Sequence, residues 1–150
     1  MLELTLCNEL LHDEGLTLRE QAEVAAALGY AGLEIAPATL GDAPHRMTAA
    51  KVAEARAAVE AAGIRVTGLH WLLTGYPEAS ITDPARRDET QEILIGLVDL
   101  CAGLGGSVLI HGSPGQRLRP EGMDDAALIA HLAEIFAPVA AAAERAGVTY

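Results

Sequence analysis

The sequence of 150 residues is poor in aromatic and basic side chains. Phe, Trp and Tyr together occupy five positions, which argues against an aromatic-rich β-sandwich. One Lys accompanies nine Arg, and the formal charge is −11, so the clustered cations that bind a nucleic-acid backbone are lacking. No uninterrupted apolar run approaches the roughly 18 residues of a membrane span. We therefore expect no nucleic-acid partner and no membrane partner.

Cysteine is also scarce. Cys7 and Cys101 lie far apart in the sequence, which fits two reduced, buried thiols better than a disulfide framework. The N-terminus, Met1-Leu2-Glu3, lacks the basic segment and apolar core of a signal peptide. Both observations lead us to expect a cytoplasmic protein.

Small apolar side chains are abundant instead. Ala occupies 29 positions, and 51% of all residues are hydrophobic, which is enough for a sizeable core. Many small side chains and few rings favour helices packed closely over a sheet. The length fits one ordinary domain, residues 1–150, with no linker inside it.

A repeated pattern predicts the fold. Four times an Ala-rich helical stretch ends at a Gly and a short β-branched run follows, with the glycines at 29, 63, 105 and 147. Gly after a helix accepts the left-handed conformation that closes the last turn. Serial αβ units predict a parallel sheet with right-handed crossovers. The expected strands are residues 2–8, 31–37, 65–69, 107–111 and 148–150.

Helix starts support this reading. Thr17 and Glu20 form a capping-box pattern, in which side chains and backbone satisfy each other's hydrogen bonds. Pro138 is expected to kink or divide the last helix. The expected helix starts are Thr17, Thr48, Asp83 and Asp124.

The length leaves two α/β architectures open. A (β/α)8 barrel needs about 250 residues, and this chain reaches only the start of a fifth unit. The sheet is therefore either open and doubly wound, or the N-terminal half of a barrel. Long loops at residues 38–47, 74–82 and 113–123 all follow strand ends, and both architectures place their sites there.

Polar side chains stand at these strand ends. Glu34, between two apolar residues, should not face a dry core unpaired. It either contacts a ligand, cation or metal, or ties neighbouring strand ends together. His70 and His111 end adjacent strands and could converge as metal ligands, substrate contacts or proton shuttles, or serve as structural groups. Trp71 is a sugar-stacking wall or core filler, and Arg117 binds an anion or sugar hydroxyls or is an exposed loop residue.

Other groups give no site. His12, His45 and His131 are expected to be solvated. The sequence has no Gly-x-Gly-x-x-Gly, no phosphate-binding loop and no Gly-x-Ser-x-Gly, so nucleotide binding and a nucleophilic elbow lack support.

Four segments, residues 6–9, 29–37, 68–73 and 112–117, span the chain in order, and the second begins Gly29-Tyr30-Ala31-Gly32-Leu33-Glu34-Ile35. These segments resemble the sugar phosphate isomerase/epimerase family of the xylose isomerase-like TIM barrels, which also include endonuclease IV-type DNA repair enzymes. The resemblance implies a (β/α)8 barrel of which this chain carries four units and the start of strand five.

The resemblance also implies a chemistry, which is metal-assisted proton transfer next to the carbonyl of a ketose or polyol-derived substrate. Its divalent metal (Mn, Mg, Co or Zn) is held by Glu, Asp, His and Glu of strands five to eight, and two of those glutamates move the proton. All four positions would follow Tyr150. His70 and His111 occupy places similar to the zinc histidines of the endonuclease branch. We expect substrate contacts from Asn8, Glu34, His70, Trp71, Ser113, Gln116 and Arg117, and metal contacts from His70 and His111.

Two alternatives stay open. The first keeps the superfamily and changes the reaction to hydrolysis or dehydration, including endonuclease IV-like cleavage, against which the charge of −11 counts. The second is a non-catalytic half-barrel, a binding or assembly module that forms homo-oligomers through its open barrel edges.

Overall fold

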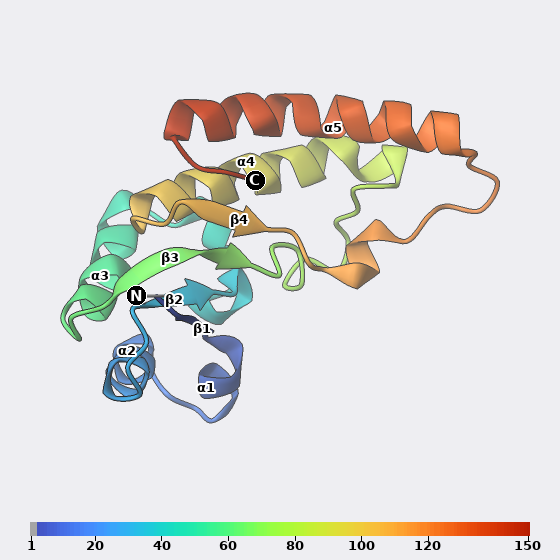
Figure 1. Cartoon of the computed structure of the whole chain (residues 1–150). Coiled ribbons are helices and arrows are strands. Elements are labelled where there is room, and N and C mark those ends of the chain that lie inside the picture. The colour runs from blue at the N-terminus through green and yellow to red at the C-terminus, as the bar shows by residue number, and fades with distance from the viewer. Residues whose placement is uncertain (1–2) are drawn as a thin grey trace.

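The computed structural model describes residues 3–150, which form one parallel sheet with helices packed on it (Figure 1). Every neighbouring pair of strands is parallel, and the spatial order is β1-β2-β3-β4. The strands are β1 Thr5–Cys7, β2 Gly32–Ile35, β3 Arg65–His70 and β4 Val108–Ile110.

This strand order decides between the two predicted architectures. A doubly wound sheet reverses direction at a switch point, so consecutive strands do not all lie side by side. Here each new strand is added on the same side of the previous one, and consecutive helices pack on one another. Both features are those of a barrel wound in one direction, so the prediction of a half-barrel of (β/α) units is confirmed.

The helices begin largely where the sequence indicates. Thr17 and Glu20 form the complete capping box, and Thr48 and Asp124 each cap a helix through their side chains. Asp83 caps a short 3₁₀ helix, η3 (Pro84–Arg86), which leads directly into α4. The helices are α1 Glu9–Asp13, α2 Leu18–Ala27, α3 Ala49–Glu60, α4 Arg87–Gly103 and α5 Asp125–Ala146.

Local details differ from expectation. β1, β2 and β4 are shorter than predicted, whereas β3 extends one residue further, to His70, and residue 2 of the first expected strand lies outside the described residues. Residues 148–150 form a single parallel bridge from Thr149 to Val108 instead of a strand. Pro138 lies inside one continuous helix of 22 residues and does not divide it, because packing of α5 on α4 compensates for one missing N–H donor. The short α1 was not predicted, since five residues carry too little periodicity to be recognised.

The core lies between the sheet and the helices. One face of the strands contributes Leu33, Ile35, Leu69 and Leu109, all of them buried. Leu97 of α4 and other apolar side chains of α4 and α5 pack against them in the same cluster. The opposite face of the sheet carries Cys7, Glu34 and half-exposed Ile110, so apolar and titratable groups share it.

An irregularity between β2 and β3 sets which side chains share that second face. Leu33 pairs with Val66, but Glu34 pairs with Gly68, so β3 has one extra residue, Thr67, at this point. His70, two residues beyond Gly68, therefore lies on the same face as Glu34.

Among the residues that the structure describes, α5 is the helix long and apolar enough to cross a membrane. Its most apolar 18-residue window has a mean hydropathy of 1.8, and 28% of that window is buried. α5 runs beside α4 along the top of the view in Figure 1. Length and composition alone are weak evidence for a span, so the absence of a membrane partner stays a prediction.

Candidate functional site

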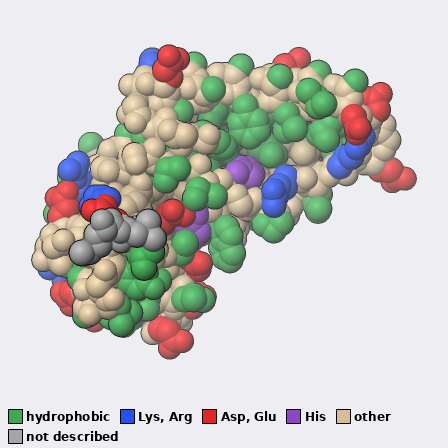
Figure 2. Space-filling view, viewed as in Figure 1, with side chains coloured by type: hydrophobic (Ala, Val, Ile, Leu, Met, Phe, Trp, Pro, Cys, Tyr) green, Lys and Arg blue, Asp and Glu red, His purple; other side chains and the backbone are tan. Residues whose placement is uncertain are grey.

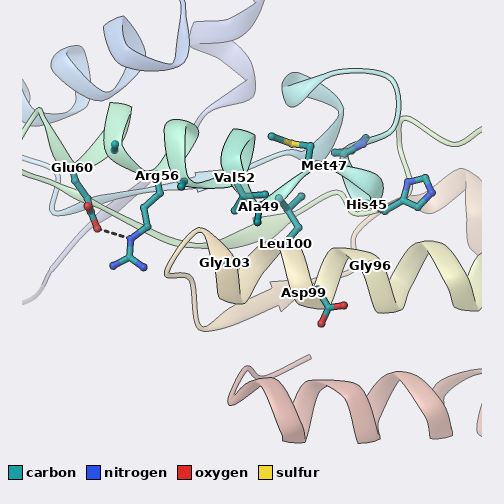
Figure 3. Close-up of a pocket in the computed structure, with 13 residues that line it drawn as sticks. His45, Met47, Ala49, Val52, Arg56, Glu60, Gly96, Asp99, Leu100 and Gly103 are labelled. Carbon is teal, nitrogen blue, oxygen red and sulfur yellow. Dashed lines mark hydrogen bonds and ion pairs between the residues drawn. The ribbon is translucent and has the colours of Figure 1, made fainter.

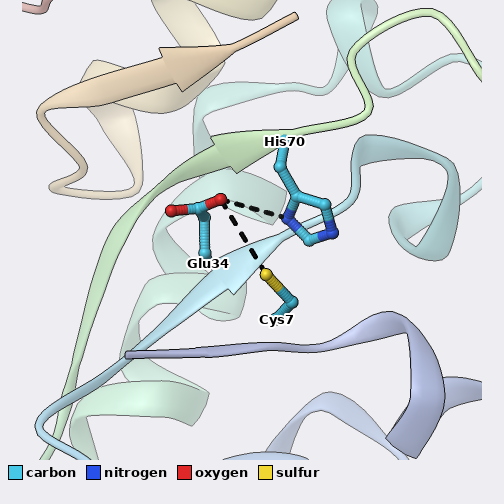
Figure 4. A group of neighbouring side chains, drawn as sticks. All are labelled: Cys7, Glu34 and His70. Carbon is cyan, nitrogen blue, oxygen red and sulfur yellow. Dashed lines mark hydrogen bonds and ion pairs between the residues drawn. The ribbon is translucent and has the colours of Figure 1, made fainter. Parts of the chain in front are cut away.

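The carboxyl ends of β1, β2 and β3 bring an imidazole and two carboxylates together. His70 Nε2 lies 2.8 Å from Glu9 Oε2, and His70 Nδ1 lies 3.6 Å from Glu34 Oε1. The Cys7 thiol lies 4.0 Å from the same Glu34 oxygen, and the three side chains point toward one another (Figure 4). Glu34 and His70, each predicted separately as a site residue, thus lie in one cluster, which also contains Cys7 and Glu9.

Burial dominates the electrostatics of this cluster. Removal from water raises the pKa of Glu34, an effect opposed by the imidazole of His70 and reinforced by the carboxylate of Glu9. Partial removal of the Cys7 thiol from water also raises its pKa, and the carboxylates of Glu34 and Glu9 add to that shift. Glu34 therefore holds a proton at higher pH than an ordinary carboxyl group, which suits a group that exchanges protons.

Asn8 joins the elements around the site through buried hydrogen bonds. Its side chain has no exposed surface; its Nδ2 donates to Gln21 Oε1 at 3.0 Å and to Thr39 Oγ1 at 2.9 Å. Its Oδ1 accepts from the Ala36 amide at 2.8 Å. These contacts join the end of β1 to α2 and to the 3₁₀ helix η1 (Pro37–Leu40) after β2, so the structure gives this predicted substrate contact a bracing position.

The loops after β3 and β4 pack closely together. Trp71 and Ser113 both have positive φ, at 52° and 43°, a conformation that non-glycine residues rarely adopt. A Cβ at Gly112 would lie 2.6 Å from Trp71 Cδ1, so the indole rests against a residue without a side chain. The side chain of Trp71 is 45% exposed, and it is therefore no core filler.

Ser113 links these two loops from inside. It is fully buried, its hydroxyl donates to the His111 carbonyl at 2.9 Å, and it accepts from the Leu73 amide at 2.9 Å. Gln116 and Arg117 lie on the following 3₁₀ helix, η4 (Pro114–Arg117), where Gln116 is half-buried and Arg117 is exposed. Of these three predicted substrate contacts, Arg117 and Gln116 are accessible.

His111 lies apart from the Cys7, Glu34 and His70 group. A hydrogen bond of 2.7 Å joins its Nδ1 to Tyr150 Oη, and its Nε2 is buried without a partner. Burial and the nearby Arg117 lower the pKa of His111 to about 4. Over residues 3–150, the group of three or more side chains able to share a metal ion is Cys7, Glu34 and His70, and His111 is not part of it.

The remaining histidines differ from expectation in two cases. His12 is exposed as predicted. His131 is buried, because it falls on the stripe of α5 that also buries Ile135 and Val139. His45 is half-buried, and its Nδ1 lies 2.6 Å from Tyr76 Oη. Burial lowers the pKa of His45, with a further contribution from Arg46.

The two cysteines differ in their exposure to solvent. Cys101 is buried as predicted, and burial raises the pKa of its thiol to about 11. Cys7 was expected to be buried and is exposed, because it lies on the face of β1 that no helix covers. Cys7 and Glu9 are the two residues of the cluster that were not among the predicted substrate or metal contacts. The signal was present, since Cys7 and Glu34 end neighbouring strands and each follows an apolar residue.

A cavity lies elsewhere, between α3 and α4 (Figure 3). Its volume is about 480 Å³, and apolar side chains such as Val52 and Leu100 line it together with the Arg56–Glu60 ion pair. None of the predicted site residues lines it. We place the candidate site at the strand ends, because the titratable groups of different strands converge there. Figure 2 shows histidine side chains beside acidic and hydrophobic ones on the face turned toward the viewer.

A parallel half-barrel with an acid–imidazole cluster at its carboxyl-terminal rim defines the class of α/β-barrel proteins. Residues 22–150 match the xylose isomerase-like TIM barrel family, and the chain belongs to that family. No curated protein sequence matches the chain.

Solved structures agree on the fold. The chain superimposes on D-psicose 3-epimerase in the presence of D-fructose with a TM-score of 0.70 and 16% identity, covering 98% of this chain and 50% of that one. For 3-keto-D-glucoside 4-epimerase from E. coli the TM-score is 0.66 and the identity 17%, and the match covers 89% of this chain and 49% of that one. D-psicose 3-epimerase with D-tagatose from Clostridium cellulolyticum H10 gives a TM-score of 0.65 and 19% identity, and the match covers 89% of this chain and 45% of that one. The chain spans about half the length of these sugar epimerases.

Proposed function

We propose that this chain forms the N-terminal, substrate-binding half of a cytoplasmic sugar isomerase or epimerase. The reaction is metal-assisted proton transfer next to the carbonyl of a ketose or polyol-derived substrate. One observation carries the proposal: Glu9, Glu34 and His70 meet at the carboxyl ends of parallel strands, where barrel enzymes place their chemistry. The fold shared with three sugar epimerases supports it.

The accessible side chains suit a small carbohydrate. The half-exposed indole of Trp71 offers a flat apolar surface for the C–H face of a sugar ring. Glu34 offers acceptor oxygens to hydroxyl groups, the largely buried imidazole of His70 contacts Glu34 and Glu9, and Arg117 and Gln116 reach from η4. Asn8 and Ser113 support this surface from inside through their backbone contacts.

The family resemblance implies a divalent metal, which would polarise the substrate carbonyl. Its ligands would come from strands five to eight, which in this proposal follow Tyr150. In this proposal residues 3–150 contribute substrate contacts, and the main ligands of the metal lie outside them. In this proposal the two glutamates that move the proton belong to those same strands.

Trp71 gives a direct test of binding, because it is the only Trp in the chain. Titration with D-fructose and D-tagatose should change its fluorescence to saturation, and a hexitol without a carbonyl should bind more weakly. His70→Gln should weaken the sugar response at least about tenfold, since it removes the imidazole that contacts both Glu9 and Glu34. Arg56→Gln, in the cavity between α3 and α4, is the matched control and should bind normally.

Activity is tested on the full-length protein, extended past Tyr150, with Mn²⁺ or Mg²⁺ and a ketose panel. Exchange of a carbon-bound substrate proton with solvent deuterium is the expected result. Absence of metal-dependent exchange for every ketose would overturn the proposed reaction. Cleavage of abasic-site DNA would instead support the endonuclease branch, and the charge of −11 predicts none.

A second candidate function is self-association of the half-barrel. The observation that favours it is Ile110, an apolar residue 49% exposed on the sheet face that the helices leave uncovered. Pairing of two such faces would bury apolar surface.

A further inference from the structure

We propose that Cys7, Glu34 and His70 form a zinc site of their own, separate from the metal centre that the family resemblance implies. The site lies on β1, β2 and β3, within this half of the fold (Figure 4). It shares Glu34 and His70 with the proposed sugar site, and zinc binding and sugar binding are measured separately so that either proposal can fail alone.

The strongest observation is an orphaned nitrogen. His70 Nδ1 is buried without a hydrogen-bond partner, and the side chain of His70 is 7% exposed. Buried polar atoms in folded proteins are almost always paired, so an unpaired ring nitrogen needs an explanation. This nitrogen faces Glu34 Oε1 at 3.6 Å, on the side where the Cys7 thiol also lies. A metal ion between these groups would give Nδ1 its missing partner.

The contact with Glu9 selects the tautomer of the His70 imidazole that can bind a metal through Nδ1. An ionised carboxylate only accepts hydrogen bonds, so the 2.8 Å contact with Glu9 places the ring hydrogen on His70 Nε2. In the neutral ring, Nδ1 then carries a lone pair directed away from Glu9. A carboxylate that orients the far nitrogen of a metal-binding histidine is the usual second contact of such sites.

The spacing is close to that of a zinc site. Each of the three residues offers a ligand atom within 4.8 Å of the other two. Zinc bonds of about 2.0–2.3 Å at tetrahedral angles separate ligand atoms by roughly 3.3–3.6 Å. The His70–Glu34 distance of 3.6 Å already fits, and the exposed Cys7 side chain needs to approach by less than a bond length.

The donor set selects the metal. Thiolate, imidazole and carboxylate together suit Zn²⁺, whereas Mg²⁺ prefers oxygen ligands alone. Three protein ligands leave a fourth position open, as in zinc sites that bind water or a substrate oxygen. Because the Cys7 thiol must lose its proton on binding, zinc affinity should rise with pH. Cys101 does not compete, since it is buried and its pKa of about 11 keeps it protonated.

The experiment is a titration of the chain with Co²⁺, followed by displacement with Zn²⁺. We expect one Co²⁺ per chain, with visible bands of tetrahedral cobalt and a near-ultraviolet band from thiolate-to-cobalt charge transfer. Cys7→Ala should abolish the charge-transfer band, and Cys101→Ala, the matched control, should keep it. His70→Gln should weaken zinc binding at least about tenfold, and His12→Gln, on exposed α1, should leave it unchanged.

Glu9→Gln tests the orienting contact. It should weaken zinc binding by about 10–100-fold while keeping the charge-transfer band, because the three ligands remain. Circular dichroism confirms that each variant is folded. Cobalt binding without a thiolate band, or equal zinc affinity for Cys7→Ala and the unaltered chain, would overturn the proposal. Zinc binding without any response of Trp71 to sugars would keep the zinc site and reject the proposed substrate.

Discussion

His70 Nε2 and Glu9 Oε2 lie 2.8 Å apart and join the end of β3 to the first turn of α1, 61 residues away in the sequence. Glu9 reaches this position because α1 begins directly after β1, at the same edge of the sheet. The contact fixes the orientation of the imidazole before any ligand arrives. Pre-oriented side chains of this kind lose less entropy when a ligand binds.

Asn8→Ala should destabilise the fold by about 2–3 kcal/mol. The substitution leaves Gln21, Thr39 and the Ala36 amide without their buried partner. Urea unfolding followed by circular dichroism measures the change. Gln116→Ala, on the surface of η4, is the control and should stay within about 0.5 kcal/mol. Equal midpoints for the two variants would show that Asn8 does not brace the site.

Gly68→Ala should destabilise the fold by about 1–3 kcal/mol. An added Cβ would lie 2.6 Å from Val108 Cγ1 and would also press on the Val108 carbonyl, so β3 and β4 would have to separate. Gly115→Ala is the matched control, since a Cβ there meets nothing within 4 Å. Thermal and urea unfolding of both variants give the comparison, and a Gly68→Ala variant as stable as Gly115→Ala would contradict it.

Stability should fall as the pH decreases from about 6.5 to about 4, in part through His111. Burial lowers the pKa of His111 from 6.5 to about 4, so in this window the unfolded chain binds a proton that the folded chain does not. The folded state is therefore penalised progressively toward pH 4, and His111 has no effect above the unfolded value. Urea midpoints across this range should fall less steeply for His111→Gln, and parallel curves would contradict the assignment.

Self-association should appear as a concentration-dependent rise in sedimentation coefficient. Ile110→Lys should shift the chain toward monomer, because it places a charge on the uncovered face of the sheet. Ile129→Lys is the matched control, as Ile129 is 66% exposed on α5, away from the strands. A folded chain that sediments as a monomer at every concentration would contradict the assembly hypothesis.

The fold was predictable because its signals are local and repeated. A glycine after each Ala-rich helix and a short apolar strand after that glycine predict the serial αβ order, and the structure confirms it. Thr17 and Glu20 give the start of α2 for the same reason, since a capping box lies within four residues. The choice of a barrel over a doubly wound sheet needed the strand order, which no local pattern contains.

The site was predictable only in part. Glu34 and His70 stand out as polar residues at the ends of apolar strands, and the structure brings them together. Cys7 was expected to be buried because burial is the usual state of a free thiol, but its strand turns it away from the helices. His131 was expected to be solvated because polar side chains on helices are usually exposed. The packing of α5 on α4 buries it instead.

The extra residue in β3 has a consequence for protein engineering. Thr67 is the residue by which β3 exceeds β2, and it puts Glu34 opposite Gly68 and turns His70 toward Glu34. If Thr67 paired with Glu34 in a regular strand, each later residue of β3 would shift by one position, and the imidazole would point into the helix layer. Moving β2 and β3 into another barrel therefore requires their pairing irregularity to move with them. The same two segments paired evenly would carry over the residue types and lose their meeting point.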